Sequence, residues 1–269
     1  MNRRMSLLRT VVCRAVVSAM IAFAIAGAAL GADIPLDKRR SGYADLGRDS
    51  KAMQDDDTIN PATLWVLDGE ALWKEKTGAA NRACADCHQD ATISMKGVGA
   101  RYPAFSPARK APIDLEQRIN LCRSEHQQAP PLGYESHDLL ALTAYVGRQS
   151  RGMAITPPSD GRLTPFIEAG RKLFTRRIGQ IDMSCAQCHD DNWGKKLAGS
   201  LIPQAQPTGY PIYRLEWQSL GSLQRRLRNC MTGLRAEAYE YGAPENVNLE
   251  LFLMWRARGM QVETPAVRP

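Results

Sequence analysis

The sequence contains two stretches that decide its fold, Cys84-Ala85-Asp86-Cys87-His88 and Cys185-Ala186-Gln187-Cys188-His189. C-x-x-C-H is the attachment signature of c-type haem. Both thiols add to the haem vinyl groups, and the adjacent histidine reaches the iron axially from the same local turn. A four-cysteine zinc site fits less well, because its cysteine pairs are usually about 15 to 20 residues apart. The sequence therefore predicts two covalently bound haem c groups.

The surroundings of the two motifs are duplicated as well. Each copy has a glycine fifteen residues before the motif, and a Tyr-Pro pair twenty residues before a remote cysteine. The matched positions are Gly69 and Gly170, Tyr102-Pro103 and Tyr210-Pro211, and Cys122 and Cys230. Self-similarity of this kind indicates an internal duplication.

Apolar residues recur at helical spacing in both copies, and alternating strand patterns are nearly absent. We therefore predict a mainly α fold made of two tandem class I cytochrome c-like domains related by internal duplication. The last apolar stripe of each copy should pack on the helix before its haem motif. This interpretation pairs Tyr145 with the helix of Gly69, and Trp255 with the helix of Gly170.

Composition divides the chain into five parts. Basic residues followed by an apolar stretch that ends in Gly31-Ala32 are typical of a secretory signal peptide, here residues 1–32. An uncleaved membrane anchor is the alternative, which the short, Ala- and Gly-rich stretch disfavours. We predict a polar N-terminal extension at 33–64, a haem 1 domain at 65–155, a Pro- and Gly-containing linker at 156–164, and a haem 2 domain with the active site at 165–269.

Most of the basic charge belongs to the predicted signal peptide. Its loss removes four arginines and no acidic residue, so the formal net charge falls from +7 to +3. The remaining lysines and arginines form no concentrated basic stretch with interleaved aromatic residues, so a nucleic-acid partner is excluded. We expect a periplasmic protein that does not stay in the membrane after cleavage.

Each iron has a histidine on one side, His88 or His189, and needs a ligand on the other. The remote cysteines Cys122 and Cys230 have the stronger claim because they occupy matched positions and follow their motifs at suitable distances. The alternatives are the methionines and two unmatched histidines, and a Cys122–Cys230 disulfide would have to meet strict geometry. These alternatives are Met95, Met153, Met231, Met260, His126 and His137.

The joint occurrence of both haem motifs with both remote cysteines resembles the SoxA family of dihaem cytochromes. The resemblance covers essentially the whole chain after residue 32 and includes the stretch Arg226-Leu227-Arg228-Asn229-Cys230. It implies that His88 and Cys122 ligate haem 1, and that His189 and Cys230 ligate haem 2. In this family the sulfur at the position of Cys230 is modified to a persulfide.

The same resemblance implies an L-cysteine S-thiosulfotransferase activity. Thiosulfate would be joined oxidatively to a cysteine of the carrier protein SoxYZ, while two electrons leave through haem. The monohaem cytochrome SoxX would form a heterodimer with the chain and accept the electrons. Two other functions stay open at this point: a dihaem thiosulfate dehydrogenase that forms tetrathionate, and a dihaem electron carrier without enzymatic activity.

Charge favours Cys230 over Cys122 as the catalytic position. Arg226 lies four residues before Cys230 and would share its helical face, where a guanidinium can bind a thiosulfate dianion. An ion pair between Arg226 and a haem propionate is the alternative, which the matching Arg118 supports. The Cys230 segment also carries Arg225, Arg228 and Arg235, whereas the Cys122 segment carries Glu116 and Glu125. We predict Cys230 and Arg226 as the catalytic residues.

Overall fold

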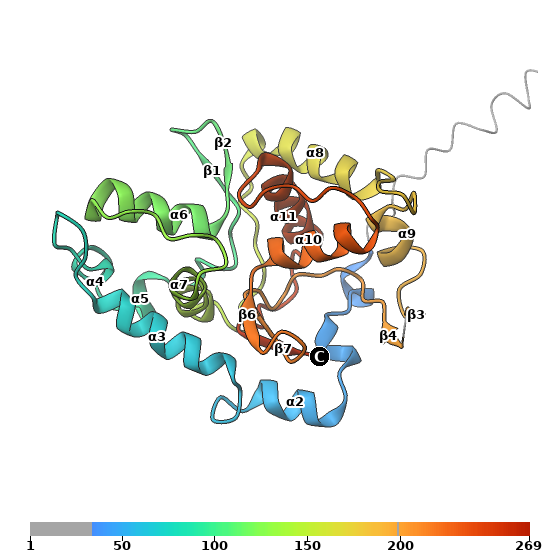
Figure 1. Cartoon of the computed structure of the whole chain (residues 1–269), viewed down its shortest axis with the longest axis horizontal. Coiled ribbons are helices and arrows are strands. Elements are labelled where there is room, and N and C mark those ends of the chain that lie inside the picture. The colour runs from blue at the N-terminus through green and yellow to red at the C-terminus, as the bar shows by residue number, and fades with distance from the viewer. Residues whose placement is uncertain (1–33, 198) are drawn as a thin grey trace, which may run out of the picture. The chain divides into compact units, whose positions relative to one another are not determined.

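The computed structural model describes residues 34–197 and 199–269, so the predicted signal peptide lies outside the described residues. The described chain is mainly α-helical with small sheets, as the sequence predicts (Figure 1). Within these two ranges, no helix combines the length and the apolar composition that a membrane crossing requires.

The N-terminal segment contains η1 (Leu36–Lys38), η2 (Gly42–Asp45) and α2 (Arg48–Asp55). The first copy follows, with α3 (Ala62–Lys74), α4 (Cys84–His88), α5 (Ala91–Ser94), β1 (Ala104–Ser106), β2 (Ala111–Ile113), α6 (Leu115–Cys122), η3 (Arg123–Gln127) and α7 (His137–Arg148).

The second copy repeats the order of long helix, haem-motif helix, hairpin and two helices, with further strands and, among the described residues, without counterparts of α5 and η3. It contains η4 (Gly161–Leu163), α8 (Thr164–Thr175), α9 (Cys185–His189), β3 (Lys196–Leu197), β4 (Ser200–Leu201), β5 (Ile212–Arg214), β6 (Ser219–Gly221), α10 (Leu223–Gly233), α11 (Pro244–Arg256) and β7 (Ala266–Arg268). The hairpins β1–β2 and β5–β6 are antiparallel counterparts, and β7 adds to β5 in parallel, with Ile212 opposite Ala266.

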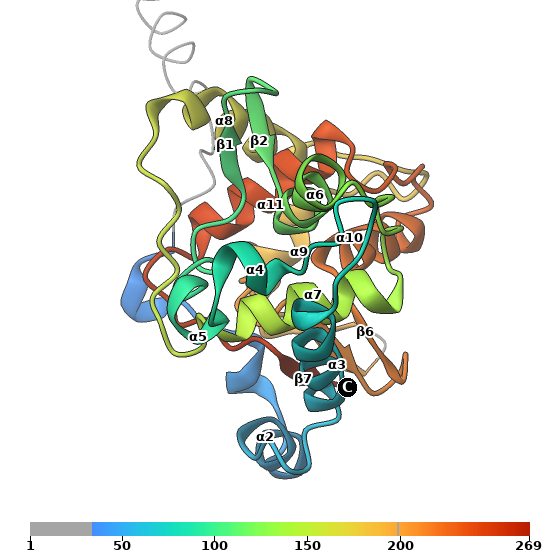
Figure 2. The same ribbon diagram turned by 90° about the vertical axis from the view of Figure 1, so that its left-hand side faces the viewer.

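In each copy the first long helix crosses the last helix, α3 against α7 and α8 against α11 (Figures 1 and 2). A glycine lies at each crossing. A Cβ on Gly69 in α3 would overlap the carbonyl oxygen of Ala141 in α7, and a Cβ on Gly170 in α8 would overlap that of Asn248 in α11. Only glycine lets the backbones approach this closely. The two glycines that the repeat matches therefore hold the crossed helices in place.

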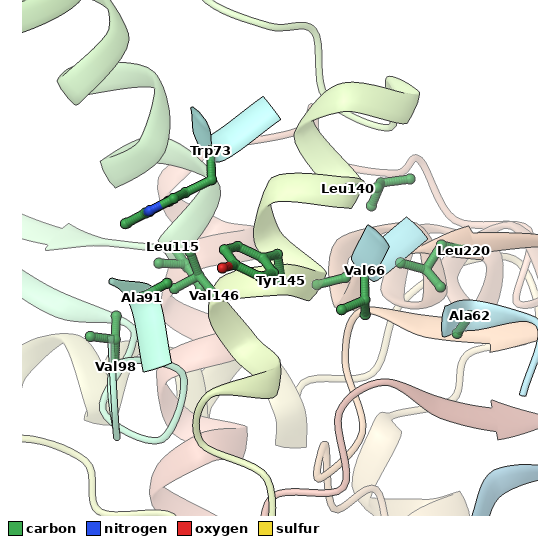
Figure 3. Close-up of a cluster of buried hydrophobic side chains, with 11 residues drawn as sticks. Ala62, Val66, Trp73, Ala91, Val98, Leu115, Leu140, Tyr145, Val146 and Leu220 are labelled. Carbon is green, nitrogen blue, oxygen red and sulfur yellow. The ribbon is translucent and has the colours of Figure 1, made fainter. Parts of the chain in front are cut away.

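Aromatic side chains fill the space beside each crossing. In the first copy Tyr145 contacts Trp73, with ring centroids 5.9 Å apart, inside the cluster drawn in Figure 3. In the second copy Phe252 contacts Phe174 at 5.4 Å and lies against Gly170. Trp255 contacts α8 as predicted, with its ring centroid 5.0 Å from the guanidinium of Arg171, and it also stacks on Phe252. Phe252, however, is the residue that lies directly against Gly170.

The ends of the two copies are joined to each other by backbone hydrogen bonds. The amide of Gly152 donates to the carbonyl of Val262 at 2.8 Å, and the amide of Ile155 donates to that of Met260 at 2.7 Å. Ile155 and Val262 are buried together with side chains from both copies. We call residues 152–155 and 259–262 the inter-copy joint.

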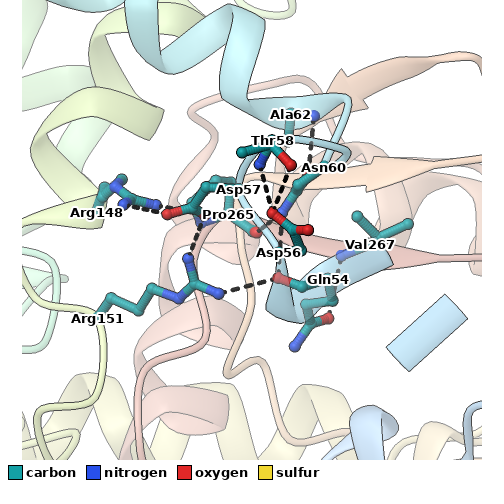
Figure 4. Close-up of polar contacts among 10 residues, drawn as sticks. All are labelled: Gln54, Asp56, Asp57, Thr58, Asn60, Ala62, Arg148, Arg151, Pro265 and Val267. Atoms are coloured by element: carbon teal, nitrogen blue, oxygen red, sulfur yellow. Dashed lines mark hydrogen bonds and ion pairs between the residues drawn. The ribbon is translucent and has the colours of Figure 1, made fainter. Parts of the chain in front are cut away.

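The segment before α3 is anchored through Asp57 (Figure 4). The Asp57 carboxylate accepts two hydrogen bonds from Arg148, at 2.9 and 2.6 Å, and one from Arg151 at 2.7 Å. Gln54 accepts from the amide of Val267 in β7 at 3.1 Å. The residues predicted as a polar extension thus include helix α2 and contact both the end of α7 and the C-terminal strand.

Candidate functional site

Both C-x-x-C-H motifs form single-turn helices whose first turns are capped. In α9 the Ser184 hydroxyl accepts from the amide of Gln187 at 3.2 Å, and the Gln187 side chain accepts from the amide of Ser184 at 2.9 Å. In α4 the Asp86 carboxylate accepts from the amide of Ala83 at 2.9 Å. These capping contacts fix the turn that places two thiols and one imidazole on the same side.

The loop before each motif binds the segment that follows the matched remote cysteine. The amide of Ala80 donates to the carbonyl of Gln127 at 3.2 Å, and the amide of Gln180 donates to that of Arg235 at 3.4 Å. Gly78 and Gly179 have positive φ, and a Cβ on either would overlap this segment. The close backbone contact therefore brings helices α6 and α10 to the haem motifs.

This arrangement places each remote cysteine beside its own haem motif. Burial and, secondly, the charge of Cys122 raise the pKa of Cys84. Burial and the charge of Cys230 raise the pKa of Cys185 to about 11, and they also raise the pKa of Cys188. The six cysteines of the described chain are all free, so no Cys122–Cys230 disulfide is present there.

The donors in both copies fit a covalently attached haem. Each copy brings together a free thiol pair, a histidine and a third sulfur, which is the set that attachment and axial ligation require. The Nδ1 atom of His189 lies 2.7 Å from the carbonyl oxygen of Pro203, a contact that leaves Nε2 for a metal. Burial lowers the pKa of His189 and favours the neutral imidazole that a metal ligand needs.

Arg118 and Arg226 occupy matched positions in the two copies, but the contacts of their side chains differ. The Nε atom of Arg118 donates to the hydroxyl of Tyr102 at 3.4 Å. In the described part of the chain, the half-buried Arg226 side chain has no hydrogen-bond or ion-pair partner. Burial raises the pKa of Tyr210, the counterpart of Tyr102, and the charges of the nearby Arg226 and Cys230 act on it in opposite directions. An unpaired guanidinium beside the remote sulfur is therefore specific to the second copy.

Two other arginines near Cys230, Arg225 and Arg228, have structural partners, whereas Arg235 is exposed and has no side-chain partner among the described residues. The guanidinium of Arg225 lies 4.3 Å from the centroid of the Trp217 ring and 3.8 Å from Glu135. That of Arg228 contacts the carbonyl of Tyr239 and lies 4.6 Å from the ring centroid of Tyr241.

The negative charge near Cys122 is also smaller than the sequence suggests. Glu116 is 8% exposed and does not face solvent, whereas Glu125 is exposed. Burial and the charge of Asp114 raise the pKa of Glu116 to about 8. The asymmetry between the copies thus rests on Arg226 more than on the summed charge of the two segments.

The other candidate iron ligands have structural roles or lie in solvent. Met153 and Met260 belong to the inter-copy joint, where their carbonyls accept backbone hydrogen bonds. Met95 packs on the first core and Met231 is buried in the second. His126 is exposed, and His137 lies 3.2 Å from Asp68.

Sequence reasoning missed Arg214 at the end of β5. Its guanidinium binds Glu216 at 2.9 Å and lies 5.2 Å from the ring centroid of Trp217, while its Nε atom is buried without a partner among the described residues. Burial, followed by the charge of Arg226, lowers the pKa of Arg214. The matched position in β1 is Ser106, and this departure from the repeat was the signal available in the sequence.

A family model described as the SoxA/TsdA cytochrome c domain matches residues 68–155 and 169–262. The two matched ranges coincide with the two copies that share the geometry above. The chain belongs to the SoxA family. Covalently bound haem follows from its cytochrome c domains.

Curated relatives and a solved structure agree with this assignment. The chain is 37% identical to the L-cysteine S-thiosulfotransferase subunit SoxA of Pseudaminobacter salicylatoxidans, over 87% of this chain and 82% of the relative. It is 32% identical to the Paracoccus pantotrophus subunit, over 85% of this chain and 78% of that one. The crystal structure of SoxXA from P. pantotrophus matches with a TM-score of 0.83 and 32% identity, covering 86% of this chain and 87% of that chain.

Proposed function

We propose that the chain carries two haem c groups, each held between a histidine and a remote cysteine. Haem 1 would be attached at Cys84 and Cys87 and ligated by His88 and Cys122. Haem 2 would be attached at Cys185 and Cys188 and ligated by His189 and Cys230. The domain boundaries 65–155 and 165–269 are part of this proposal, and the position of each remote cysteine beside its own motif supports it.

The protein acts as an L-cysteine S-thiosulfotransferase at Cys230. A sulfur–sulfur bond forms between the outer sulfur of thiosulfate and a cysteine of the carrier SoxYZ. The carrier thiol loses its proton to water and two electrons leave, so the product is a cysteine S-sulfonate with one additional sulfur. A haem held by His189 and Cys230 would supply the electron acceptor that this reaction requires.

Arg226 binds and orients the thiosulfate dianion in this reaction. Its guanidinium has no partner in the described chain, and it lies one helical turn before Cys230 on α10 (Leu223–Gly233). A planar guanidinium binds a sulfonate group through two parallel hydrogen bonds, which directs the outer sulfur toward a neighbouring group. This unpaired cation next to Cys230 is the observation that carries the proposal.

The partners follow from the names of the relatives. The P. pantotrophus structure is a SoxXA complex, so we expect SoxX to bind this chain and to accept the electrons. The sequence of residues 1–32 supports export to the periplasm, where SoxYZ would deliver its cysteine.

Matched substitutions in the two copies test the proposal. Arg226→Ala should lower thiosulfate turnover by roughly 1.5 to 3 kcal/mol of transition-state stabilisation, the range expected for a charge-assisted hydrogen bond. Arg118→Ala is the control and should leave most activity. Cys230→Met should abolish turnover, and Cys122→Met should retain an appreciable part of it. The measurement is SoxYZ-dependent reduction of cytochrome c by thiosulfate.

Two results would reject this assignment. An active Cys230→Met together with an inactive Cys122→Met would move the catalytic site to the first copy. Equal losses in Arg226→Ala and Arg118→Ala would show that the two arginines share a structural role, such as pairing with haem propionates.

A further inference from the structure

A cavity of about 50 Å³ lies where the two copies meet. Its walls come from both copies and include Glu116 of α6 and Glu250 of α11. Hydroxyl groups complete the polar part of the wall; they belong to Tyr102, Thr143, Thr208, Tyr210 and Thr264. A polar cavity of this volume can hold water.

The carboxyl groups at this cavity have no cation to balance them. In residues 34–197 and 199–269, neither Glu116 nor Glu250 forms an ion pair, and the 8% exposed Glu116 has no side-chain hydrogen bond. Gln224 connects the copies by donating to Asp114 at 2.7 Å and to Glu250 at 3.5 Å. The charged or titratable groups that surround the pair are Asp114, Tyr134, Glu135, Tyr102, Tyr210 and Arg109.

Glu116 is buried and Glu250 is half-buried at the same cavity. Two carboxylates that share a largely enclosed site ionise together only at an energetic cost. At least one of them therefore holds a proton at neutral pH, which agrees with the direction of their pKa values. Burial and the charge of Asp114 raise the pKa of Glu116, and burial followed by the charge of Glu116 raises that of Glu250. A change in a nearby charge can therefore add a proton to Glu116 or Glu250, or remove one.

The cavity is connected to the predicted iron ligands of both copies. Tyr102 lines it and accepts a hydrogen bond from Arg118, which lies one helical turn before Cys122. Tyr210 also lines it, near Arg226 and Cys230. A change of one charge at either predicted iron site therefore acts on the carboxyl pair through the protein interior, where electrostatic interactions are stronger than in bulk water.

We propose that Glu116 and Glu250 form a redox-linked proton-binding site between the two copies. When the protein accepts one electron, one proton moves from solvent water to a carboxylate oxygen of this pair. When the electron leaves, the proton returns to solvent, and no other bond forms or breaks. The inference concerns the haem-containing protein and does not depend on its catalytic site.

Potentiometric titrations of the complete, haem-loaded protein over about pH 6 to 9 test the site. The midpoint potential of the parent should fall as the pH rises. Glu116→Gln and Glu250→Gln keep the side-chain volume. Each should reduce the slope of midpoint potential against pH at least twofold. Glu168→Gln, at an exposed side chain on α8, is the matched control and should keep the parent slope.

Redox difference infrared spectra separate these carboxyls from the haem propionates. The parent and Glu168→Gln should show a change in a protonated-carboxyl band upon reduction, and Glu116→Gln or Glu250→Gln should lack it. A parent potential that is independent of pH would overturn the proposal. A slope and an infrared band that persist in both glutamine variants would overturn it as well, because the proton would then bind elsewhere.

Discussion

Asp57 is the residue that anchors the N-terminal segment to the end of α7 and the turn after it. It pairs with Arg148 and Arg151 at the end of α7, and Arg151 also donates to the carbonyl of Gln54 at 2.9 Å. These hydrogen bonds lower the pKa of Asp57 from 3.8 to about 2, against the opposing effect of burial. Its contribution to stability is thus present above about pH 4 and is lost as the pH falls toward 2.

Asp57→Asn should lower the free energy of unfolding at pH 7 by about 1 kcal/mol. This figure is below the value that the pKa shift alone would give, because the side chain is 39% exposed and solvent screens the pairs. Urea unfolding at pH 7 and pH 2.5 checks it, and the difference between the variant and the parent should be clearly smaller at the lower pH. Asp49→Asn, at a 95% exposed side chain, is the control. An equal effect of both substitutions at pH 7 would contradict the prediction.

At the residue scale the sequence was most informative where the chemistry is covalent. The C-x-x-C-H spacing predicts the single turns of α4 and α9, and the repeat predicts that Cys122 and Cys230 occupy equivalent places. It could not predict which arginines are unpaired. The partners of Arg225 and Arg228 come from loops and rings that have no fixed spacing from the motif.

At the scale of elements, the crossings α3–α7 and α8–α11 organise each copy. Gly170→Ala adds a methyl group against the backbone of α11, so one of the two helices has to shift. We expect a loss of roughly 1 to 3 kcal/mol in the free energy of unfolding, as for other overpacked sites. Thermal unfolding followed by far-ultraviolet circular dichroism measures it.

Gly161→Ala is the matched control for this crossing, because a Cβ there meets no atom within 4 Å. Its unfolding midpoint should stay close to that of the parent. A Gly170→Ala protein as stable as Gly161→Ala would show that the helices do not need the close approach.

Helical periodicity predicts the elements well but leaves the register of the second crossing open. Phe252 and Trp255 lie three residues apart, so both fit one apolar stripe. Gly170 determines which of the two lies at the crossing. It has no side chain, so Phe252 can pack directly against its backbone. Periodicity does not predict the short strands. For example, β7 has only three residues, and it pairs with β5, which lies far from it in the sequence.

At the scale of the whole molecule, the two copies form one packed unit across residues 34–269. The inter-copy joint, the carboxyl-lined cavity and the contact of Gln54 with β7 all join parts that the repeat treats as separate. A repeat shows which positions are equivalent but does not contain the contacts between the copies. The sequence therefore predicts the repeated fold of each copy and misses the interface that connects their sites.

The central claim is that both irons are held between a histidine and a cysteine thiolate. Spin-resonance spectroscopy of the oxidised, haem-loaded protein tests it most directly, because the axial ligands determine the signals of low-spin ferric iron. We expect two low-spin signals typical of histidine–thiolate ligation, with one altered in Cys122→Met and the other in Cys230→Met. Signals typical of histidine–methionine ligation, unchanged in both variants, would contradict the account.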